Sequence, residues 1–234
     1  MAAPTVLFLP GLLEDADGFQ KQIDSIGSRA TCVVADLTRS ETIAALAKDA
    51  LAQAGDTPRL CVAAHSMGGY VALELMRQAP GRVERLALLN TNARADSAEA
   101  TDNRKRLMGL AEKDFPAVIS TLMPKLLHEE HRGNTAIVGT LTEMALATGR
   151  DAFLRQQRAI IRRIDSRPHL GAIRCPTLVV AAREDAIMPV EMLEELARGI
   201  PGSRFEIIER CGHSSMLERP THVSKLLIDW LGNG

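Results

Sequence analysis

Six short apolar runs lie along the chain, and helical segments separate most of them. The runs cover residues 5–9, 31–36, 59–64, 85–90, 177–182 and 204–209. Most are apolar throughout rather than at alternate positions, which is typical of strands covered on both faces. The alternation of such strands with helices predicts an α/β fold, in which helices flank a mostly parallel sheet of about six strands.

Several helical segments have recognisable ends. Thr38 and Glu41 have the spacing of a capping box ahead of an apolar-periodic segment over 42–53. Pro189 and Pro220 each precede a further helical segment, where a missing backbone amide costs nothing. These signals support helices between and after the strands.

The alternation stops between residues 94 and 168, where no convincing strand is found. Four helical patterns follow one another there, near 101–113, 115–127, 135–149 and 151–164. A stretch of about 70 residues exceeds what a crossover between parallel strands needs. We therefore expect a core made of 1–93 and 169–234, with a helical cap, 94–168, inserted into it.

The composition narrows the choice of partners. Apolar residues make up 46% and charged residues 24% of the 234 residues, which is the balance of an ordinary globular protein. A formal net charge of -1 and an aromatic content of 3% argue against nucleic acid or an anionic membrane surface as the partner. The apolar run near the N-terminus is broken by Pro10 and Gly11, which argues against a signal peptide or a membrane span. We expect a cytoplasmic protein, either monomer or homodimer.

A single hydroxyl stands where the third predicted strand gives way to a helix, in the sequence Ala64-His65-Ser66-Met67-Gly68. A nucleophile at such a turn projects clear of the sheet, and the next backbone amide points into the same space. The crowded turn needs small residues two positions before and after it, and Ala64 and Gly68 supply them. The alternative is a serine that caps a helix, with glycines that allow close packing.

Two further loops offer partners for Ser66. Asp185 follows the strand predicted over 177–182, with Glu184 as its neighbouring competitor, and His213 follows the last predicted strand. A serine hydroxyl needs a base, and the base needs an orienting acid. Because parallel strands end at one edge of a sheet, we expect these loops to meet there.

Two backbone amides are candidates for an oxyanion hole, which needs two fixed donors. Met67 follows the serine, and Leu12 follows Pro10-Gly11 in the loop after the first predicted strand. The alternative for the second site is that Pro-Gly forms only a turn.

His65 should point away from the hydroxyl because side chains alternate along a strand. The remaining histidines are interpreted as exposed or structural: His128, His131, His169 and His222.

Four motifs, in this order, resemble the α/β-hydrolase superfamily: LPGLLEDADGF, AAHSMGGYVALELM, TLVVAARED and RCGHSSMLERP. They are similar to the small cap-bearing branch with bacterial carboxylesterases, enol-lactonases and the biotin-pathway methyl esterase. The resemblance implies that Ser66 is the nucleophile, His213 the base and Asp185 its orienting acid. It implies that the amides of Leu12 and Met67 bind the oxyanion and that no metal or cofactor is needed. The sequence departs from the usual pattern at the oxyanion loop, where Pro10-Gly11 replaces His-Gly.

We expect the chain to hydrolyse a carboxylic ester of a small or medium apolar substrate through an acyl-enzyme. The alternatives are a lactonase, an acyltransferase, a carbon–carbon bond hydrolase and a receptor-like binding protein on this fold. Apolar cap residues are expected mainly to pack, with a few lining the pocket: Met108, Leu110, Leu122, Leu127, Met144 and Leu146. Five cap arginines either meet an anionic substrate or form an exposed face, the latter being favoured: Arg104, Arg106, Arg155, Arg158 and Arg162.

Overall fold

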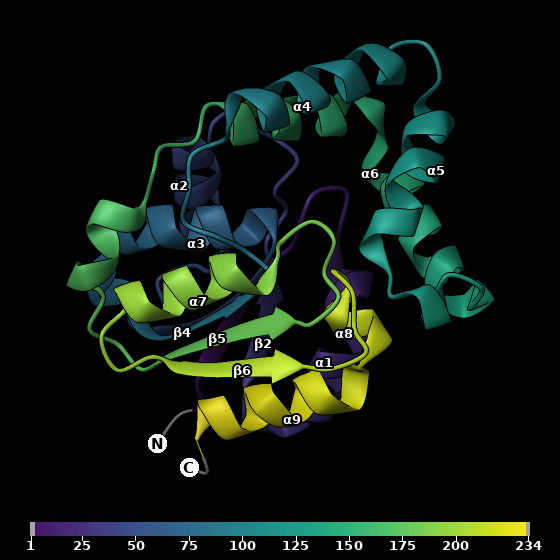
Figure 1. The fold of residues 1–234 in the computed structure, drawn as a ribbon. Coiled ribbons are helices and arrows are strands. Elements are labelled where there is room, and N and C mark those ends of the chain that lie inside the picture. Colours follow the sequence, from purple (N-terminus) through teal and green to yellow (C-terminus); the bar gives the residue numbers. More distant parts are fainter. Residues whose placement is uncertain (1–2, 233–234) are drawn as a thin grey trace.

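A computed structural model describes residues 3–232 of the chain (Figure 1). This part of the chain contains one six-stranded sheet. All five strand pairs are parallel, and the order across the sheet is β2-β1-β3-β4-β5-β6. The strands are β1 (Thr5–Leu9), β2 (Thr31–Val34), β3 (Leu60–His65), β4 (Val83–Leu89), β5 (Thr177–Ala182) and β6 (Arg204–Ile208). The predicted α/β fold is confirmed, while residues 1–2 and 233–234 of the predicted core lie outside the described part.

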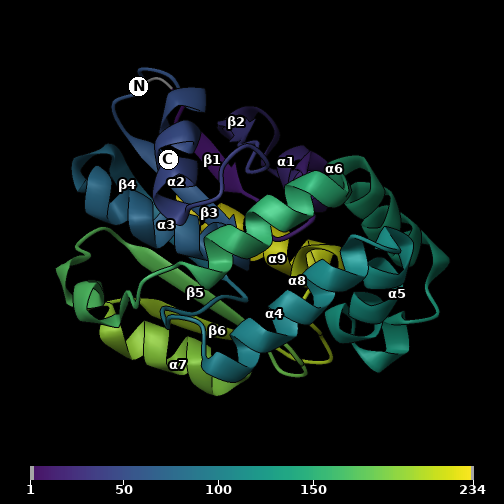
Figure 2. The ribbon, with the colours of Figure 1, turned by 90° about the horizontal axis from the view of Figure 1, so that it is seen from above.

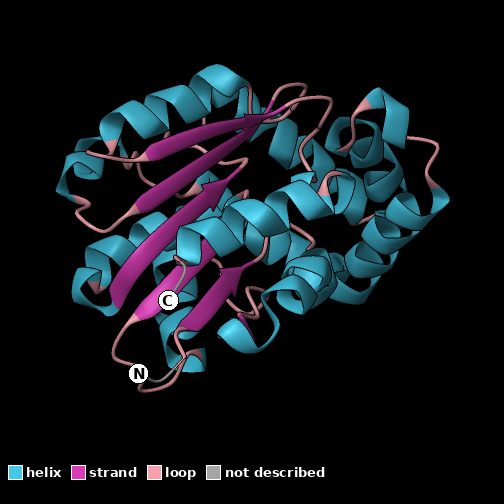
Figure 3. Ribbon diagram, turned by 90° about the horizontal axis from the view of Figure 1, so that it is seen from below, coloured by secondary structure: helices cyan, strands magenta, loops and turns pink. Residues whose placement is uncertain are grey.

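Helices cover both faces of the sheet (Figure 3). One face packs against α2 (Ile43–Gln53), α3 (Met67–Gln78) and α7 (Val190–Gly199), and the other against α1 (Gln20–Ile26) and α9 (Pro220–Leu231). Along β1, Leu7 and Leu9 belong to the first core, whereas Val6 and Phe8 belong to the second. This double coverage explains why the strands are apolar at every position.

Three helices pack on one another and lie beyond the carboxyl ends of the strands (Figures 1 and 2). They are α4 (Ala98–Ala111), α5 (Phe115–Leu126) and α6 (Thr135–Ile161), and together they are called the helical layer below. Gly149 interrupts α6 with φ 81° and ψ 166°, at the break expected between the last two helical patterns. Leu13, from the loop after β1, is buried in the apolar cluster of this layer. The helical layer therefore covers that loop.

The predicted capping box is wrong. Helix α2 begins at Ile43, and Thr42 caps it by accepting a hydrogen bond from the Ala45 amide at 3.2 Å. The Thr38 hydroxyl instead donates to a carboxylate oxygen of Asp36 in the loop after β2. Both threonines fit a cap by spacing, and the position where the chain turns out of the loop decides between them.

The remaining short helix, α8 (Ser215–Glu218), follows the last strand and leads into α9. Within residues 3–232, no helix is long and apolar enough to span a membrane.

Candidate active site

Ser66 occupies a sharp turn between β3 and α3. Its backbone has φ 50° and ψ -115°, a region that side-chain-bearing residues rarely adopt. A Cβ atom placed on Gly68 would lie 2.0 Å from the carbonyl oxygen of Leu9, so only glycine fits there. The turn thus presses α3 against the end of β1 and leaves the serine at the carboxyl edge of the sheet.

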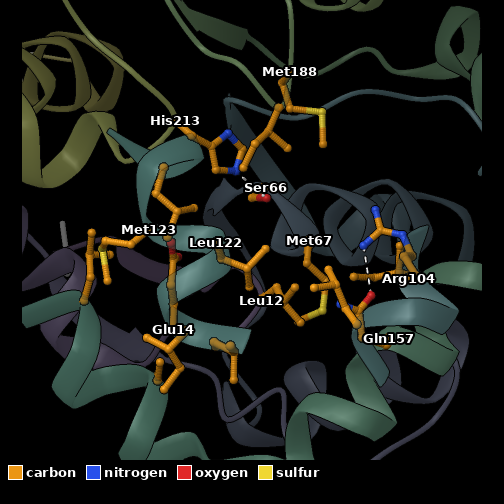
Figure 4. Close-up of a pocket in the computed structure, with 18 of the residues that line it drawn as sticks. Leu12, Glu14, Ser66, Met67, Arg104, Leu122, Met123, Gln157, Met188 and His213 are labelled. Atoms are coloured by element: carbon orange, nitrogen blue, oxygen red, sulfur yellow. Dashed lines mark hydrogen bonds between the residues drawn. The ribbon is translucent and has the colours of Figure 1, made fainter. Parts of the chain in front are cut away.

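The three residues expected to act together do meet at this edge. Nε2 of His213 lies 2.8 Å from Oγ of Ser66, and Nδ1 lies 2.7 Å from Oδ2 of Asp185. All three side chains are buried or nearly so. They come from the loops after β3, β5 and β6, and they form a continuous hydrogen-bonded line from hydroxyl to carboxylate (Figure 4 shows Ser66 and His213).

Asp185 is held as a carboxylate by four donors. Its Oδ1 accepts the amides of Ile187 and Met188, and its Oδ2 accepts Nδ2 of Asn90 at 2.9 Å as well as the His213 ring. Burial alone would raise the pKa of Asp185, but the charge of His213 and these hydrogen bonds hold it below its usual value. Glu184, the neighbouring competitor, accepts the amide of Cys211 instead.

Asn90 is a site residue that the sequence reasoning missed. It is fully buried at the end of β4, with φ 48°. Ser215 donates to its Oδ1 at 2.6 Å, which fixes the amide so that Nδ2 points to Asp185. The available signal was a polar residue directly after an apolar strand, the same signal that singled out Asp185.

The two residues predicted to supply oxyanion amides, Leu12 and Met67, line the same cavity as Ser66. Met67 is the first residue of α3, so its amide has no intrahelical acceptor. The Leu12 amide donates to no acceptor within residues 3–232. The next residue, Leu13, has φ 62° and donates its amide to Oε1 of Gln156 on α6, which ties this loop to the helical layer.

A cavity of about 120 Å³ opens in front of Ser66 (Figure 4). Its wall is mainly apolar and comes from both the core and the helical layer. Five polar residues other than the serine also line it: Glu14, Tyr70, Arg104, Gln157 and His213.

Most of the apolar residues predicted for the cap pack as expected, but only one lines the cavity and Leu146 does neither. Leu122 lines the cavity, whereas Met108 and Leu110 pack in the cluster around Phe153. Met144 and Leu127 form a second buried cluster, and Leu146 is 51% exposed.

Only Arg104 among the five cap arginines lines the cavity. Arg155 donates to the Thr38 carbonyl, Arg158 and Arg162 face Glu41, and Arg106 contacts Asn103. The exposed interpretation therefore does not hold for Arg104.

A buried pair, Glu14 and His65, makes hydrogen bonds to two loops of the site. Nδ1 of His65 lies 2.8 Å from Oε2 of Glu14, which also accepts the Gly11 amide, and Nε2 contacts the His213 carbonyl at 2.9 Å. Burial alone would raise the pKa of Glu14 and lower that of His65. Their mutual attraction reverses both, so the pKa of Glu14 is lowered and that of His65 is raised.

The other histidines have structural or exposed positions. Glu218 accepts the His128 amide and Nδ1 of His131, each at 2.8 Å, and it also accepts the Gly212 amide. It thereby joins the loop of His213 to the segment between α5 and α6. His169 and His222 are exposed. Within the described residues, no group of three or more His, Cys, Asp or Glu side chains is arranged to hold a metal ion.

Comparison with known proteins agrees with this fold. The model of one protein family, described as alpha/beta hydrolase fold, matches residues 4–220. The chain belongs to the α/β hydrolase fold family.

The named relatives are hydrolases that cleave different kinds of bond. The chain is 30% identical to the pimeloyl-[acyl-carrier protein] methyl ester esterase of Neisseria meningitidis over 79% of its own length and 74% of the relative's. This chain is also 28% identical to the 2-hydroxy-6-oxononadienedioate/2-hydroxy-6-oxononatrienedioate hydrolase of Cupriavidus pinatubonensis. The similarity covers 76% of this chain and 64% of that protein. Among solved structures, a thermophilic esterase from Thermogutta terrifontis has a TM-score of 0.89 and 29% identity, covering 97% of this α/β hydrolase and 89% of the esterase. These relatives support a hydrolase.

Proposed function

We propose that this α/β hydrolase cleaves a carboxylic ester of a small or medium apolar substrate through an acyl-enzyme. The observation that carries the proposal is the position of His213, whose two ring nitrogens contact Ser66 and Asp185 at 2.8 and 2.7 Å. These are hydrogen-bond distances suited to proton transfer from the serine hydroxyl. The apolar cavity in front of the hydroxyl supports an apolar substrate.

The reaction follows from these contacts. His213 takes the proton of Ser66 while the hydroxyl oxygen attacks the ester carbonyl, and Asp185 stabilises the imidazolium that forms. The amides of Leu12 and Met67 hold the tetrahedral oxyanion. His213 then protonates the leaving alcohol, and a water molecule, activated by the same histidine, releases the acid and restores Ser66.

The helical layer has the role of a cap in this proposal, with 94–168 inserted between 1–93 and 169–234. Its side chains form much of the cavity wall, among them Ile119, Leu122, Met123 and Leu126. Closing the site from water strengthens the electrostatic contacts around the oxyanion. It also limits the size of the acyl or alcohol group that enters.

A carbon–carbon bond hydrolase is the second candidate. The similarity to the Cupriavidus pinatubonensis enzyme favours it, and the same serine, histidine and carboxylate suit both reactions. A small panel of esters, lactones, thioesters and diketones, given to the purified protein, distinguishes the two by which bond is cleaved.

The direct test is covalent labelling by a fluorophosphonate probe, combined with turnover of p-nitrophenyl butyrate. We expect wild type to be labelled and active, and Ser66→Ala and His213→Ala to lose both while their circular dichroism spectra stay unchanged. Ser120→Ala, on the exposed side of α5, is the matched control and should keep both. Labelling that persists in Ser66→Ala would contradict the proposal.

A further inference from the structure

Two polar side chains interrupt the apolar wall of the cavity away from Ser66. Arg104 comes from α4 and Gln157 from α6, and Nη1 of Arg104 donates to Oε1 of Gln157 at 3.0 Å. Figure 4 shows this pair on one side of the cavity and Glu14 on another, with Leu12 and Met67 between the pair and Ser66. The cavity therefore has a reactive part, an apolar middle and a polar end.

Only the oxygen of the Gln157 amide group makes a hydrogen bond. The side chain is fully buried, and its Nε2 has no hydrogen-bond partner among the described residues. The oxygen and nitrogen cannot be exchanged, because arginine only donates and so requires the oxygen. A buried N–H without an acceptor costs free energy, and an acceptor on a molecule in the cavity would recover it.

The neighbouring residue Gln156 gives a contrast within the same helix. It is equally buried, but its Oε1 accepts the Leu13 amide and its Nε2 donates to the Leu37 carbonyl. Both ends of the Gln156 amide group therefore make hydrogen bonds that hold the fold together. The unpaired donor occurs at the residue that lines the cavity.

The charge around Arg104 is not balanced by its protein partner. Asp96 is its carboxylate, with Nε of Arg104 at 3.0 Å from Oδ2, but Asp96 also pairs with Arg163 at 2.6 Å. One carboxylate therefore serves two guanidinium groups. Nη2 of Arg104 donates to no acceptor among the described residues, and its side chain is 19% exposed. The cluster keeps a positive charge with a free donor at the cavity.

We propose that Arg104 and Gln157 form a carboxylate-binding subsite, so that the preferred ester carries a second, ionised carboxylate beyond an apolar segment. Arginine and an amide N–H offer donors that a carboxylate can accept, and the surplus charge favours an anion over a neutral carbonyl. The proposal rests on the proposed ester hydrolysis for the position of the scissile bond. The subsite itself requires only the cavity and these two side chains.

The test compares matched esters. Mono-p-nitrophenyl esters of linear dicarboxylic acids with six to eight carbons are compared with p-nitrophenyl esters of fatty acids with the same number of carbons. We expect kcat/KM to be higher for the dicarboxylic series in wild type. The ratio between the two series should fall about tenfold to hundredfold in Arg104→Gln, as expected for loss of a charged hydrogen bond. Gln157→Glu should lower it too, because the new carboxylate neutralises Arg104 and repels the substrate.

Arg106→Gln is the matched control, since Arg106 lies two residues along α4 and is exposed. It should keep the wild-type ratio. A second pair, 4-carboxyphenyl butyrate and phenyl butyrate, shows whether the carboxylate belongs to the alcohol part instead of the acyl part. The proposal is overturned if neither pair shows a preference that Arg104→Gln or Gln157→Glu removes.

Binding to an inactive variant separates this proposal from the proposed reaction. Monomethyl adipate is titrated calorimetrically into Ser66→Ala and into Ser66→Ala/Arg104→Gln. Binding to the first and its loss in the second support the subsite, even if no ester is ever cleaved. Turnover of neutral esters without binding of either monomethyl adipate or 4-carboxyphenyl butyrate overturns the subsite and leaves the hydrolase in place.

Discussion

Oε2 of Glu14 lies 2.8 Å from Nδ1 of His65, and both side chains are buried. The same carboxylate oxygen accepts the Gly11 amide, and the other ring nitrogen of His65 contacts the carbonyl of His213. The pair therefore connects the loop after β1 with the loop after β6. These are the two loops that would supply an oxyanion donor and the general base.

Replacing Glu14 by glutamine keeps an acceptor for Gly11 but removes the charge that faces His65. We expect Glu14→Gln to lower the free energy of unfolding by about 1–3 kcal/mol at pH 6, because a buried polar contact loses its partner. Urea unfolding followed by circular dichroism measures this. Glu143→Gln, at an exposed position of α6, should change the same quantity by less than about 0.5 kcal/mol.

The loss should also depend on pH in a defined way. The ionised form of Glu14, whose pKa is lowered, stabilises the fold above its ordinary pKa of 4.5, and this contribution disappears as the pH falls through the lower folded-state pKa. The protonated form of His65, whose pKa is raised, stabilises the fold below 6.5, and this contribution disappears as the pH rises through the higher folded-state pKa. The stability difference between wild type and Glu14→Gln should therefore be largest between about pH 4.5 and 6.5. A difference that is the same from pH 4 to pH 9 would show that the charges are not coupled.

Asp185→Asn should reduce kcat for p-nitrophenyl butyrate by about ten-thousandfold, because an amide at this position favours the wrong tautomer of His213. Steady-state kinetics at pH 7.5 measure the effect. Glu184→Gln serves as the neighbouring control: its side chain can still accept the Cys211 amide, so kcat should stay within about threefold of wild type. Equal losses in the two variants would mean that the loop, and not the carboxylate at 185, is what matters.

Gly68→Ala should destabilise the protein by at least about 1–3 kcal/mol or prevent folding, because the new methyl group meets the Leu9 carbonyl. Gly109→Ala is the opposite case. Gly109 lies inside α4 with open space around the position of its Cβ atom, so alanine should raise stability by about 0.5–1 kcal/mol. Thermal unfolding of both variants tests this, and a stable Gly68→Ala would show that the turn can widen.

Strand positions followed closely from the sequence because apolar runs mark buried strands directly. The predicted ranges 5–9 and 177–182 agree with β1 and β5 to the residue. β4 begins at Val83, two residues before its predicted start, because the exposed Glu84 separates Val83 from the apolar run. Polar residues at a strand end do not show in an apolar pattern.

Contacts between distant side chains were harder to predict. The spacing of motifs brought Ser66, Asp185 and His213 to one edge, since parallel strands all end there. His65 was expected only to avoid the serine hydroxyl, and its partner Glu14 is 51 residues away in a loop. Arg104 and Gln157 are likewise 53 residues apart, and how α4 packs on α6 decides that they meet. No short pattern records such packing.

Gln156 and Gln157 are consecutive on α6, yet one holds the amide of Leu13 and the other lines the polar end of the cavity. The two residues share one turn of backbone, so a shift of that turn would move both amides. Mutations that displace the α6 backbone there would therefore change the polar end of the cavity and the loop beside the serine together. Efforts to redirect this hydrolase toward other substrates should therefore use side-chain exchanges that keep the α6 backbone in place.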